Sequence, residues 1–495
     1  MFESILLGIS NVFEPFNLLM CIVGLFIGVL FGALPGFSAT MGVAVFIPFS
    51  YVMEPEAAML LLAGIYCGGV YGGTIPAILI GIPGTPASAP TALEGQAMTK
   101  KGESGKSLLL ATIGSTIGGV ISSLALLFGA PALAIIAMKV GSPEQAMVAI
   151  FGLSVVCMLS YDNMLKGLLV GFISLVVATI GQDPVMGYPR FTFGMYQLIG
   201  GIDVVSVLIG IFSIPQVLIM LENLNKDDNK VNKLSKLKIT AKDITSNIVN
   251  FIRSSIIGVA IGIIPAAGPD IASFFSYNEA KKASKSPEKF GNGSEEGIIA
   301  SETANNAVTG GSLIPLLTLA IPGSAPAALF LGAMIIHGLR PGPLLFTQNA
   351  KEIYTLLVGF LVINICMFFV GYIYCKMAGK ILLIPNAILC TIIVVLATVG
   401  SFSINQNIFD VIVMYISGII GYIMVKNDFP TSPVALALLL GPILEENLVQ
   451  VKTLFGDNLL ILFTRPLFTI FFCFTIFSYA FPFIKNMKRK KIVER

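Results

Sequence analysis

Proline and glycine interrupt four apolar stretches of this chain, and the interruptions carry hydroxyl, amide or carboxyl groups. Residues 34–40 read LPGFSAT and residues 82–91 read IPGTPASAPT. Residues 265–270 read PAAGPD, and residues 321–324 read IPGS. Proline removes an amide donor and clashes with the preceding helical turn, while glycine permits unusual backbone angles. A helix that restarts after such a break offers uncovered amides with partial positive charge, which suits the binding of a carboxylate.

Polar side chains beside these breaks could add to such a site. Asn305 and Asn306 lie in the stretch ETANNA and offer carbonyl and amide groups to a substrate carboxylate or a hard cation. Asp270 is an ionisable residue in an apolar setting, which indicates a coupling role, although a helix N-cap after Pro269 is the alternative. The expected substrate-binding residues are Gly36, Ser38, Thr40, Gly73, Thr74, Pro83, Gly84, Thr85, Ser88, Gly268, Asn305, Asn306, Gly323 and Ser324, and those expected for the coupling ion are Asp270 and Asn305.

The elements that position these residues must lie in a membrane. Only 12% of the 495 residues are charged and 55% are hydrophobic, whereas soluble domains carry about 25% charged residues. Apolar runs such as 16–34, 108–128, 356–374 and 459–483 approach the roughly 20 residues that a spanning helix needs. The runs are continuous rather than alternating, which excludes a β-barrel. We predict an all-α polytopic membrane protein with about 11–13 transmembrane helices.

The breaks recur in order, which indicates an internal repeat. Residues 28–35 read GVLFGALP and residues 258–265 read GVAIGIIP. In each half a Gly-Gly pair and an apolar segment then precede the tripeptide IPG, at 82–84 and at 321–323. Repeated halves with broken helices are typical of secondary transporters. The alternatives for single breaks are kinked helices or ordinary loops, and those for the whole chain are a channel or a non-carboxylate transporter on the same scaffold.

Basic segments predict the orientation of the two halves. The polar segment 222–250 is rich in lysine and the tail contains Lys485 and Lys488–Lys491; both are expected in the cytoplasm. Inverted repeats fit this placement only with one extra helix, which the run 459–483 supplies. We therefore divide the chain into a first transmembrane repeat (1–221), a cytoplasmic polar linker (222–250), a second repeat (251–456), and an extra C-terminal helix with a basic cytoplasmic tail (457–495).

Several classes of function are excluded by what the sequence lacks. It contains no GxSxG, HExxH or Walker A motif, so we expect no enzyme and no cofactor. Its seven cysteines form no CxxC pair and its one histidine, His337, is expected to be structural, so we expect no metal beyond Na⁺ as a coupling ion. A net charge of +3 is too small to imply a nucleic-acid partner.

At these motifs the chain resembles the large permease subunit of the tripartite tricarboxylate transporters, from about residue 20 to about residue 347. The resemblance implies ion-gradient-driven import, with Na⁺ or H⁺ as coupling ion, by a multi-pass protein of the inner (cytoplasmic) cell membrane. It also implies a small four-helix membrane subunit and an extracytoplasmic solute-binding protein as partners. Two departures are Glu94, where the family usually has Asp, and Pro269-Asp270, where it has small residues. The stretches that carry the resemblance are GALPGFSAT, YCGGVYGGTIPAILIGIPGTPASAPTALEGQAMTKKG, GQDPVMGYPRFTFG and ASETANNAVTGGSLIPLLTLAIPGSAPAALFLGAMIIHGLRPGPLLF.

Overall fold

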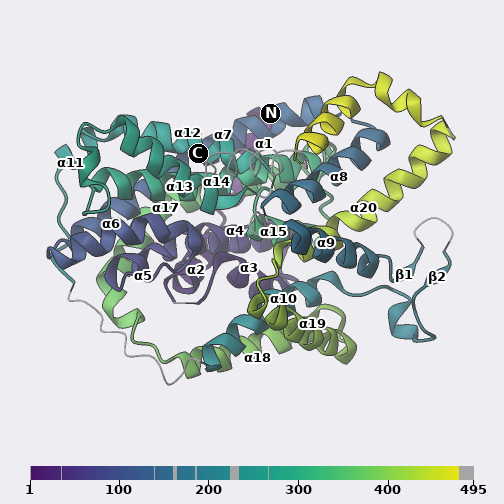
Figure 1. The fold of residues 1–495 in the computed structure, drawn as a ribbon, viewed down its shortest axis with the longest axis horizontal. Coiled ribbons are helices and arrows are strands. Elements are labelled where there is room, and N and C mark those ends of the chain that lie inside the picture. The colour runs from purple at the N-terminus through teal and green to yellow at the C-terminus, as the bar shows by residue number, and fades with distance from the viewer. Residues whose placement is uncertain are drawn as a thin grey trace, which may run out of the picture.

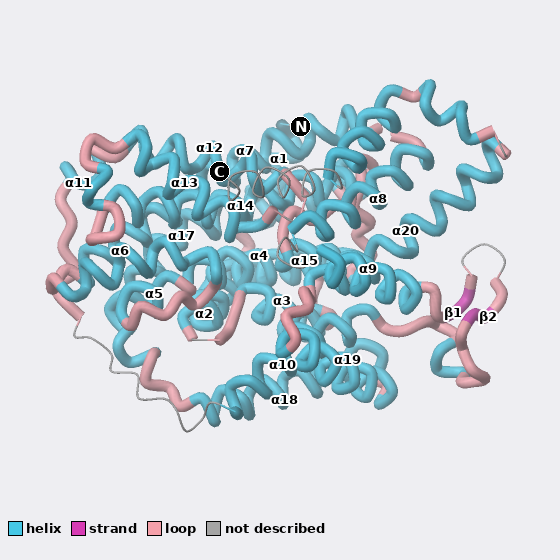
Figure 2. The backbone as a smooth tube through the Cα atoms, in the orientation of Figure 1, coloured by secondary structure: helices cyan, strands magenta, loops and turns pink. Residues whose placement is uncertain are grey.

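The computed structural model describes residues 2–34, 36–138, 140–159, 164–183, 187–222, 234–265, 267–456 and 458–478. Most of these residues are helical, and the strands β1 (Gly181–Gln182) and β2 (Pro189–Arg190) form one short antiparallel pair (Figure 2). Within this part of the chain, eight helices are long and apolar enough to cross a membrane by length and composition, and six further apolar helices are shorter. The predicted all-α polytopic membrane fold is confirmed.

The helices follow one another in the order that the breaks predict. In the first half they are α1 (Phe2–Val12), α2 (Pro15–Ala33), α3 (Ala39–Ser50), α4 (Pro55–Gly72), α5 (Thr74–Leu79), the 3₁₀ turn η1 (Pro86–Ser88), α6 (Ala89–Lys100), α7 (Ser104–Ala137), α8 (Ser142–Leu159), α9 (Met164–Ala178), η3 (Tyr196–Leu198) and α10 (Val204–Glu222). In the second half they are α11 (Ala241–Thr245), α12 (Ile248–Ile263), α13 (Gly268–Ala283), η5 (Pro287–Lys289), α14 (Glu295–Leu319), α15 (Ala325–Ile336), α16 (Leu345–Gln348), α17 (Ala350–Ile381), α18 (Asn386–Asn405), α19 (Ile408–Lys426), α20 (Ser432–Phe455) and η6 (Leu459–Thr464).

Two helices, α4 and α14, lie in the middle of the molecule (Figure 1). Helix α4 packs against α2, α3 and α17, and α14 packs against α7, α12 and α13. The α4 window that could span a membrane is buried along its whole length. Helix α14 is equally buried but carries serine, threonine and asparagine side chains. Such a helix does not face lipid, because its polar groups must find partners within the protein.

Glycine-lined seams join these central helices to their neighbours in both halves. A Cβ atom added at Gly28 of α2 would overlap the backbone carbonyl of Ile65 on α4, and one added at Gly258 of α12 would meet the carbonyl of Ala304 on α14. Only glycine permits such close approach of two helices. The glycines that the sequence pairs as repeat equivalents therefore pack in the same way.

The described part of the polar linker lies against the start of α7. The Ser235 amide donates to the Ser104 hydroxyl (2.9 Å), and Lys106 forms ion pairs with Asp243 (3.1 Å) and Glu295 (2.5 Å). Hydrogen bonds from Thr240 lower the pKa of the Asp243 carboxyl. Helix α12 begins at Ile248, inside the segment predicted as linker, and Lys488–Lys491 of the predicted tail lie outside the described residues.

The apolar run expected as one extra helix is divided in the structure. Residues 459–464 form the turn η6, and a helix covers residues 466–478. The division follows from Pro466, which has no amide donor and favours the first turn of a helix. This helix packs on α8, where Phe471 contacts Phe151 and Ser478 donates to Ser154 (2.6 Å).

Candidate functional site

The second and fourth breaks form two loops that fold back in the same way. We call residues 80–88 tip 1 and residues 320–324 tip 2. In tip 1 the Gly84 amide donates to the Gly73 carbonyl (3.1 Å), and in tip 2 the Gly323 amide donates to the Ser312 carbonyl (3.4 Å). A Cβ at Gly84 would overlap the carbonyl of Gly32 on α2. The two IPG motifs thus make equivalent backbone hydrogen bonds.

The matching contact in the second half involves α12. A Cβ at Gly323 would overlap the carbonyl oxygen of Gly262, the counterpart of Gly32 in the sequence repeat. Each tip is therefore seated against the last turn of the broken helix of its own half, and neither seat tolerates a side chain.

The tips differ in exposure and in what holds them. In tip 1, Pro83 is exposed and Ile82 is 42% exposed, whereas tip 2 is buried, with Ile321 only 2% exposed. The Tyr66 hydroxyl of α4 bonds to Ser324 (2.8 Å) and to Ser312 (2.8 Å).

In tip 1 the Thr85 hydroxyl bonds only within the loop. Its partner among the described residues is Ser88, at 3.3 Å, and Ser88 itself is fully buried. Tip 1 is therefore the open loop of the pair, and tip 2 is closed against α4.

The first turn of α13 contacts both tips. The Gly268 amide donates to the Gly323 carbonyl of tip 2 (3.1 Å). The Asp270 carboxylate, which keeps solvent access, accepts a hydrogen bond from the backbone amide of Ala87 in tip 1. The third break thus links the two loops, and Asp270 faces the backbone of tip 1 instead of capping its own helix.

The first break lies against other helices. The Ser38 hydroxyl accepts from the Met41 amide (3.2 Å) and caps α3, in whose first turn Thr40 is half-buried. Gly36 has a φ of 86° and packs against Gln216 of α10. Helix α3 itself packs against α15, the helix that follows tip 2. The Ser38 hydroxyl therefore has a structural use as a helix cap.

The two asparagines lie buried on α14 with unfilled hydrogen-bonding capacity. The Asn305 amide nitrogen donates to the Val70 carbonyl (3.3 Å) and to the Glu302 carboxylate (3.4 Å). The Asn305 Oδ1 atom and both polar side-chain atoms of Asn306 have no hydrogen-bond partner among the described residues. Buried polar atoms of this kind usually have partners in native proteins, so they mark a place where a ligand can complete the bonding.

Glu302 is the site residue that the sequence analysis missed. Its fully buried carboxylate accepts hydrogen bonds from Thr91 (2.5 Å) and Thr74 (2.6 Å), and a longer one from Ser115 (3.4 Å). A signal was available, since Glu302 is the only charged residue between Gly297 and Leu319.

Glu94, the other fully buried glutamate near tip 1, has a different environment. Its carboxylate accepts from the Tyr277 hydroxyl (2.6 Å) and from the amides of Gly291 (2.6 Å), Gly293 (2.8 Å) and Ser294 (2.7 Å). These four donors fasten α6 to the loop before α14. Glu94 therefore has a structural role.

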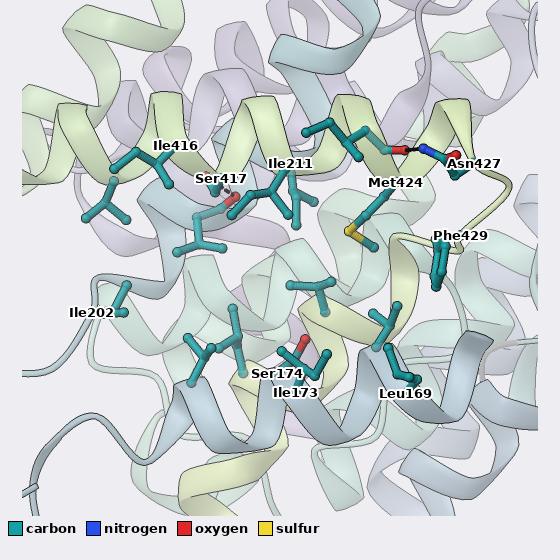
Figure 3. A pocket seen from close by; sticks show the side chains of 18 residues that line it. Leu169, Ile173, Ser174, Ile202, Ile211, Ile416, Ser417, Met424, Asn427 and Phe429 are labelled. Atoms are coloured by element: carbon teal, nitrogen blue, oxygen red, sulfur yellow. Dashed lines mark hydrogen bonds between the residues drawn. The ribbon is translucent and has the colours of Figure 1, made fainter. Parts of the chain in front are cut away.

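A crevice of about 620 Å³ lies elsewhere, between helices α9, α10, α19 and α20 (Figure 3). All but three of its lining residues are apolar, the exceptions being Ser174, Ser417 and Asn427. It offers no charged group and few donors, so it is unsuited to a carboxylate, in contrast to the loops at the breaks.

The chain is similar to known proteins over most of its length. The model of the tripartite tricarboxylate transporter TctA family matches residues 18–436. An uncharacterized 52.8 kDa protein of Agrobacterium vitis, in the TAR-I ttuC' 3'region, is 35% identical over 94% of this chain and 93% of its own length. A second uncharacterized protein of that organism, in the TAR-II ttuC' 3'region, is 36% identical over 42% of this chain and 87% of its own length. No solved structure matches. The chain belongs to the tripartite tricarboxylate transporter TctA family.

Proposed function

We propose that the chain is the permease subunit of a secondary active symporter that imports a tricarboxylate or a related carboxylate. An extracytoplasmic solute-binding protein delivers the substrate, and a small four-helix subunit accompanies the permease in the inner cell membrane. The observation that carries the proposal is the pair of equivalent tips, one open and one closed, in a single chain. A channel built by oligomerisation needs no such pair, whereas alternating access requires two gates in opposite states.

The open tip offers the groups that a carboxylate needs. Thr85 and Ser88 present hydroxyls that bond to each other (3.3 Å), and no lysine or arginine occurs in residues 80–88. Together with Asn306, these neutral donors replace the water that the anion loses. The substrate is thus held between tip 1 and α14, and tip 2 takes the corresponding role when the gates exchange their states.

Two acidic side chains beside tip 1 support the coupling of transport to cations. Asp270 contacts the backbone of tip 1, and Glu302 contacts Thr74 and Thr91, which flank that tip. An anionic substrate would be repelled by these carboxylates unless cations enter with it, because the fully buried Glu302 lies at low dielectric, where like charges interact strongly. This charge balance supports symport with Na⁺ or H⁺.

Uptake measurements in liposomes test the proposal. The permease and its small membrane subunit are reconstituted, the solute-binding protein is added outside, and a panel of labelled tricarboxylates and dicarboxylates is supplied. We expect accumulation above the external concentration only when an inward Na⁺ or H⁺ gradient is imposed. Equilibration without accumulation under every gradient would indicate a channel, and no uptake of any carboxylate would refute the substrate class.

A further inference from the structure

The cluster around Glu302 lies where the two halves of the chain meet at tip 1. Glu302 belongs to α14 in the second half, while Thr74 and Thr91 stand on either side of tip 1 in the first. We propose that the Glu302 carboxylate, the hydroxyls of Thr74, Thr91 and Ser115 and the carbonyl oxygen of Asn305 bind one Na⁺, which holds tip 1 in place. The coupling role of this ion rests on the proposed function, but its binding does not.

The charge of the cluster requires a cation. Glu302 is fully buried, and no lysine, arginine or histidine pairs with it among the described residues. Its polar contacts are three hydroxyls and one amide, all neutral. A buried carboxylate without a positive partner is strongly unfavourable. One bound monovalent cation removes the net charge.

The available donor atoms fit a hard alkali cation. They are all oxygens, and hard cations prefer oxygen ligands. A hydroxyl that donates to the carboxylate still has lone pairs for a cation. In the described residues no group of three or more His, Cys, Asp or Glu side chains could hold a metal ion, so the single negative charge here suits Na⁺ better than a divalent or transition metal.

The unpartnered amide oxygen of Asn305 is a further oxygen ligand for the ion. Asn305 turns its Nδ2 toward Glu302 and leaves Oδ1 without a partner. When a cation is bound beside the carboxylate, the Asn305 amide is expected to turn over, because Oδ1 can then bind the cation whereas Nδ2 cannot. A proton on Glu302 would also neutralise the charge and would supply an O–H donor for Asn305 Oδ1, so the binding measurement below separates the two ions.

The same contacts connect the ion to the loop. Thr74 directly follows Gly73, whose carbonyl accepts from the Gly84 amide of tip 1. Thr91 lies on α6, three residues after Ser88, where the tip ends. An ion that binds both threonine hydroxyls together with Glu302 therefore fixes the two ends of the open tip, so that Na⁺ orders the hydroxyls that the tip offers to the substrate.

Equilibrium binding of radioactive ²²Na⁺ to the purified full-length chain, without any carboxylate, tests this site. We expect saturable binding that K⁺ does not displace, and a loss of affinity of more than about tenfold in Glu302→Gln, equivalent to about 1.4 kcal/mol. Glu94→Gln is the matched control, since that carboxylate is equally buried but saturated by four donors; its Na⁺ affinity should stay within about twofold.

Thr91 supplies a second test in case Glu302→Gln does not fold. Thr91→Ser keeps the hydroxyl and should retain binding, whereas Thr91→Val should lose it. If ²²Na⁺ does not bind saturably, the proposal is overturned. This holds also when uptake depends only on protons. Unchanged affinity in Glu302→Gln would do the same.

The chain contains no tryptophan, so one introduced tryptophan reports on the environment of tip 1 by its fluorescence. In Ile82→Trp the single indole lies on the exposed loop, and Na⁺ should shift its fluorescence, but not when Glu302→Gln is added. A tryptophan at the exposed Val52, at the end of α3, should not respond. Neither assay uses a substrate, so Na⁺ binding without carboxylate uptake would refute the proposed function alone, and uptake without Na⁺ binding would refute this inference alone.

Discussion

Tip 1 and tip 2 fold back through equivalent backbone hydrogen bonds, but different side chains contact them. The difference arises at one pair of equivalent positions in α4 and α14. The carbonyls of Gly69 and Val308 face the equivalent glycines Gly32 and Gly262. Three residues before them stand Tyr66 on α4 and Asn305 on α14. The two tips can therefore be compared through these counterparts.

The side chains at these two positions differ in length and contact different groups. The Tyr66 hydroxyl extends to Ser324 and closes tip 2, whereas Asn305 bonds to Val70 and Glu302 and does not hold Thr85. A repeat can thus supply two loops of equal backbone geometry, while single side chains decide which of them is held closed. The following experiments test this comparison.

The largest effect is expected at the open tip. Thr85→Val and Asn306→Ala should each weaken carboxylate binding by about 10- to 150-fold, since a hydrogen bond to a charged group contributes about 1.5–3 kcal/mol. Binding titrations on the purified variants measure this. Thr116→Val, which removes a hydroxyl bonded within α7, is the control. Affinities within about twofold of the parent for both site variants would place the substrate elsewhere.

A methyl group added at the equivalent glycines of the two tips, Gly84 and Gly323, should reduce the stability of the protein by different amounts. Gly323→Ala places a Cβ against the Gly262 carbonyl in a fully buried loop and should cost about 1–3 kcal/mol of stability, while Gly84→Ala in the partly exposed tip 1 should cost less. Thermal unfolding in detergent compares them. Gly379→Ala, where a Cβ meets nothing within 4 Å, serves as control. Equal losses at the two tips would contradict the difference in closure.

Removal of the Tyr66 hydroxyl should loosen tip 2. Tyr66→Phe deletes the bonds to Ser312 and Ser324 and should shift the closed state by about 0.5–1.5 kcal/mol, up to roughly tenfold in population. Maleimide labelling of Ile321→Cys, in a background without the native cysteines, should become faster by that order. A rate unaffected by Tyr66→Phe would show that the tyrosine does not hold the gate.

The orientation of the tips can be fixed without disturbing the fold. We predict that Lys236 faces the cytoplasm, because it belongs to a lysine-rich segment beside the ends of spans. Lys236→Cys should resist membrane-impermeant reagents added outside intact cells and react after permeabilisation, with no change in transport. Labelling from outside would reverse the assignment of both gates.

The sequence predicted the fold class and the positions of the backbone breaks, because proline and glycine act locally. The breaks occur where the motifs place them, and Gly28, Gly258 and the two IPG motifs pack as equivalents. The apolar run from Leu459 was predicted as one helix although Pro466 divides it.

Side-chain partners could not be predicted in the same way. The hydrogen bond between Tyr66 and Ser324 joins residues 258 positions apart, and no local sequence pattern around either residue predicts it. Glu302 could have been noticed as a lone acid, but its three hydroxyl partners come from α5, α6 and α7. Such convergence depends on tertiary packing, which a single sequence does not encode in any local pattern.

The glycine seams also set a rule for engineering this protein. Replacing glycine by alanine often stabilises a protein by about 0.4–1 kcal/mol, since it reduces the freedom of the unfolded chain. Along α2 and α12 the sign should reverse, because a methyl group at Gly28 or Gly258 would force the backbones apart. Gly171 of α9 has open space around it and is where a stabilised variant for structural work should begin.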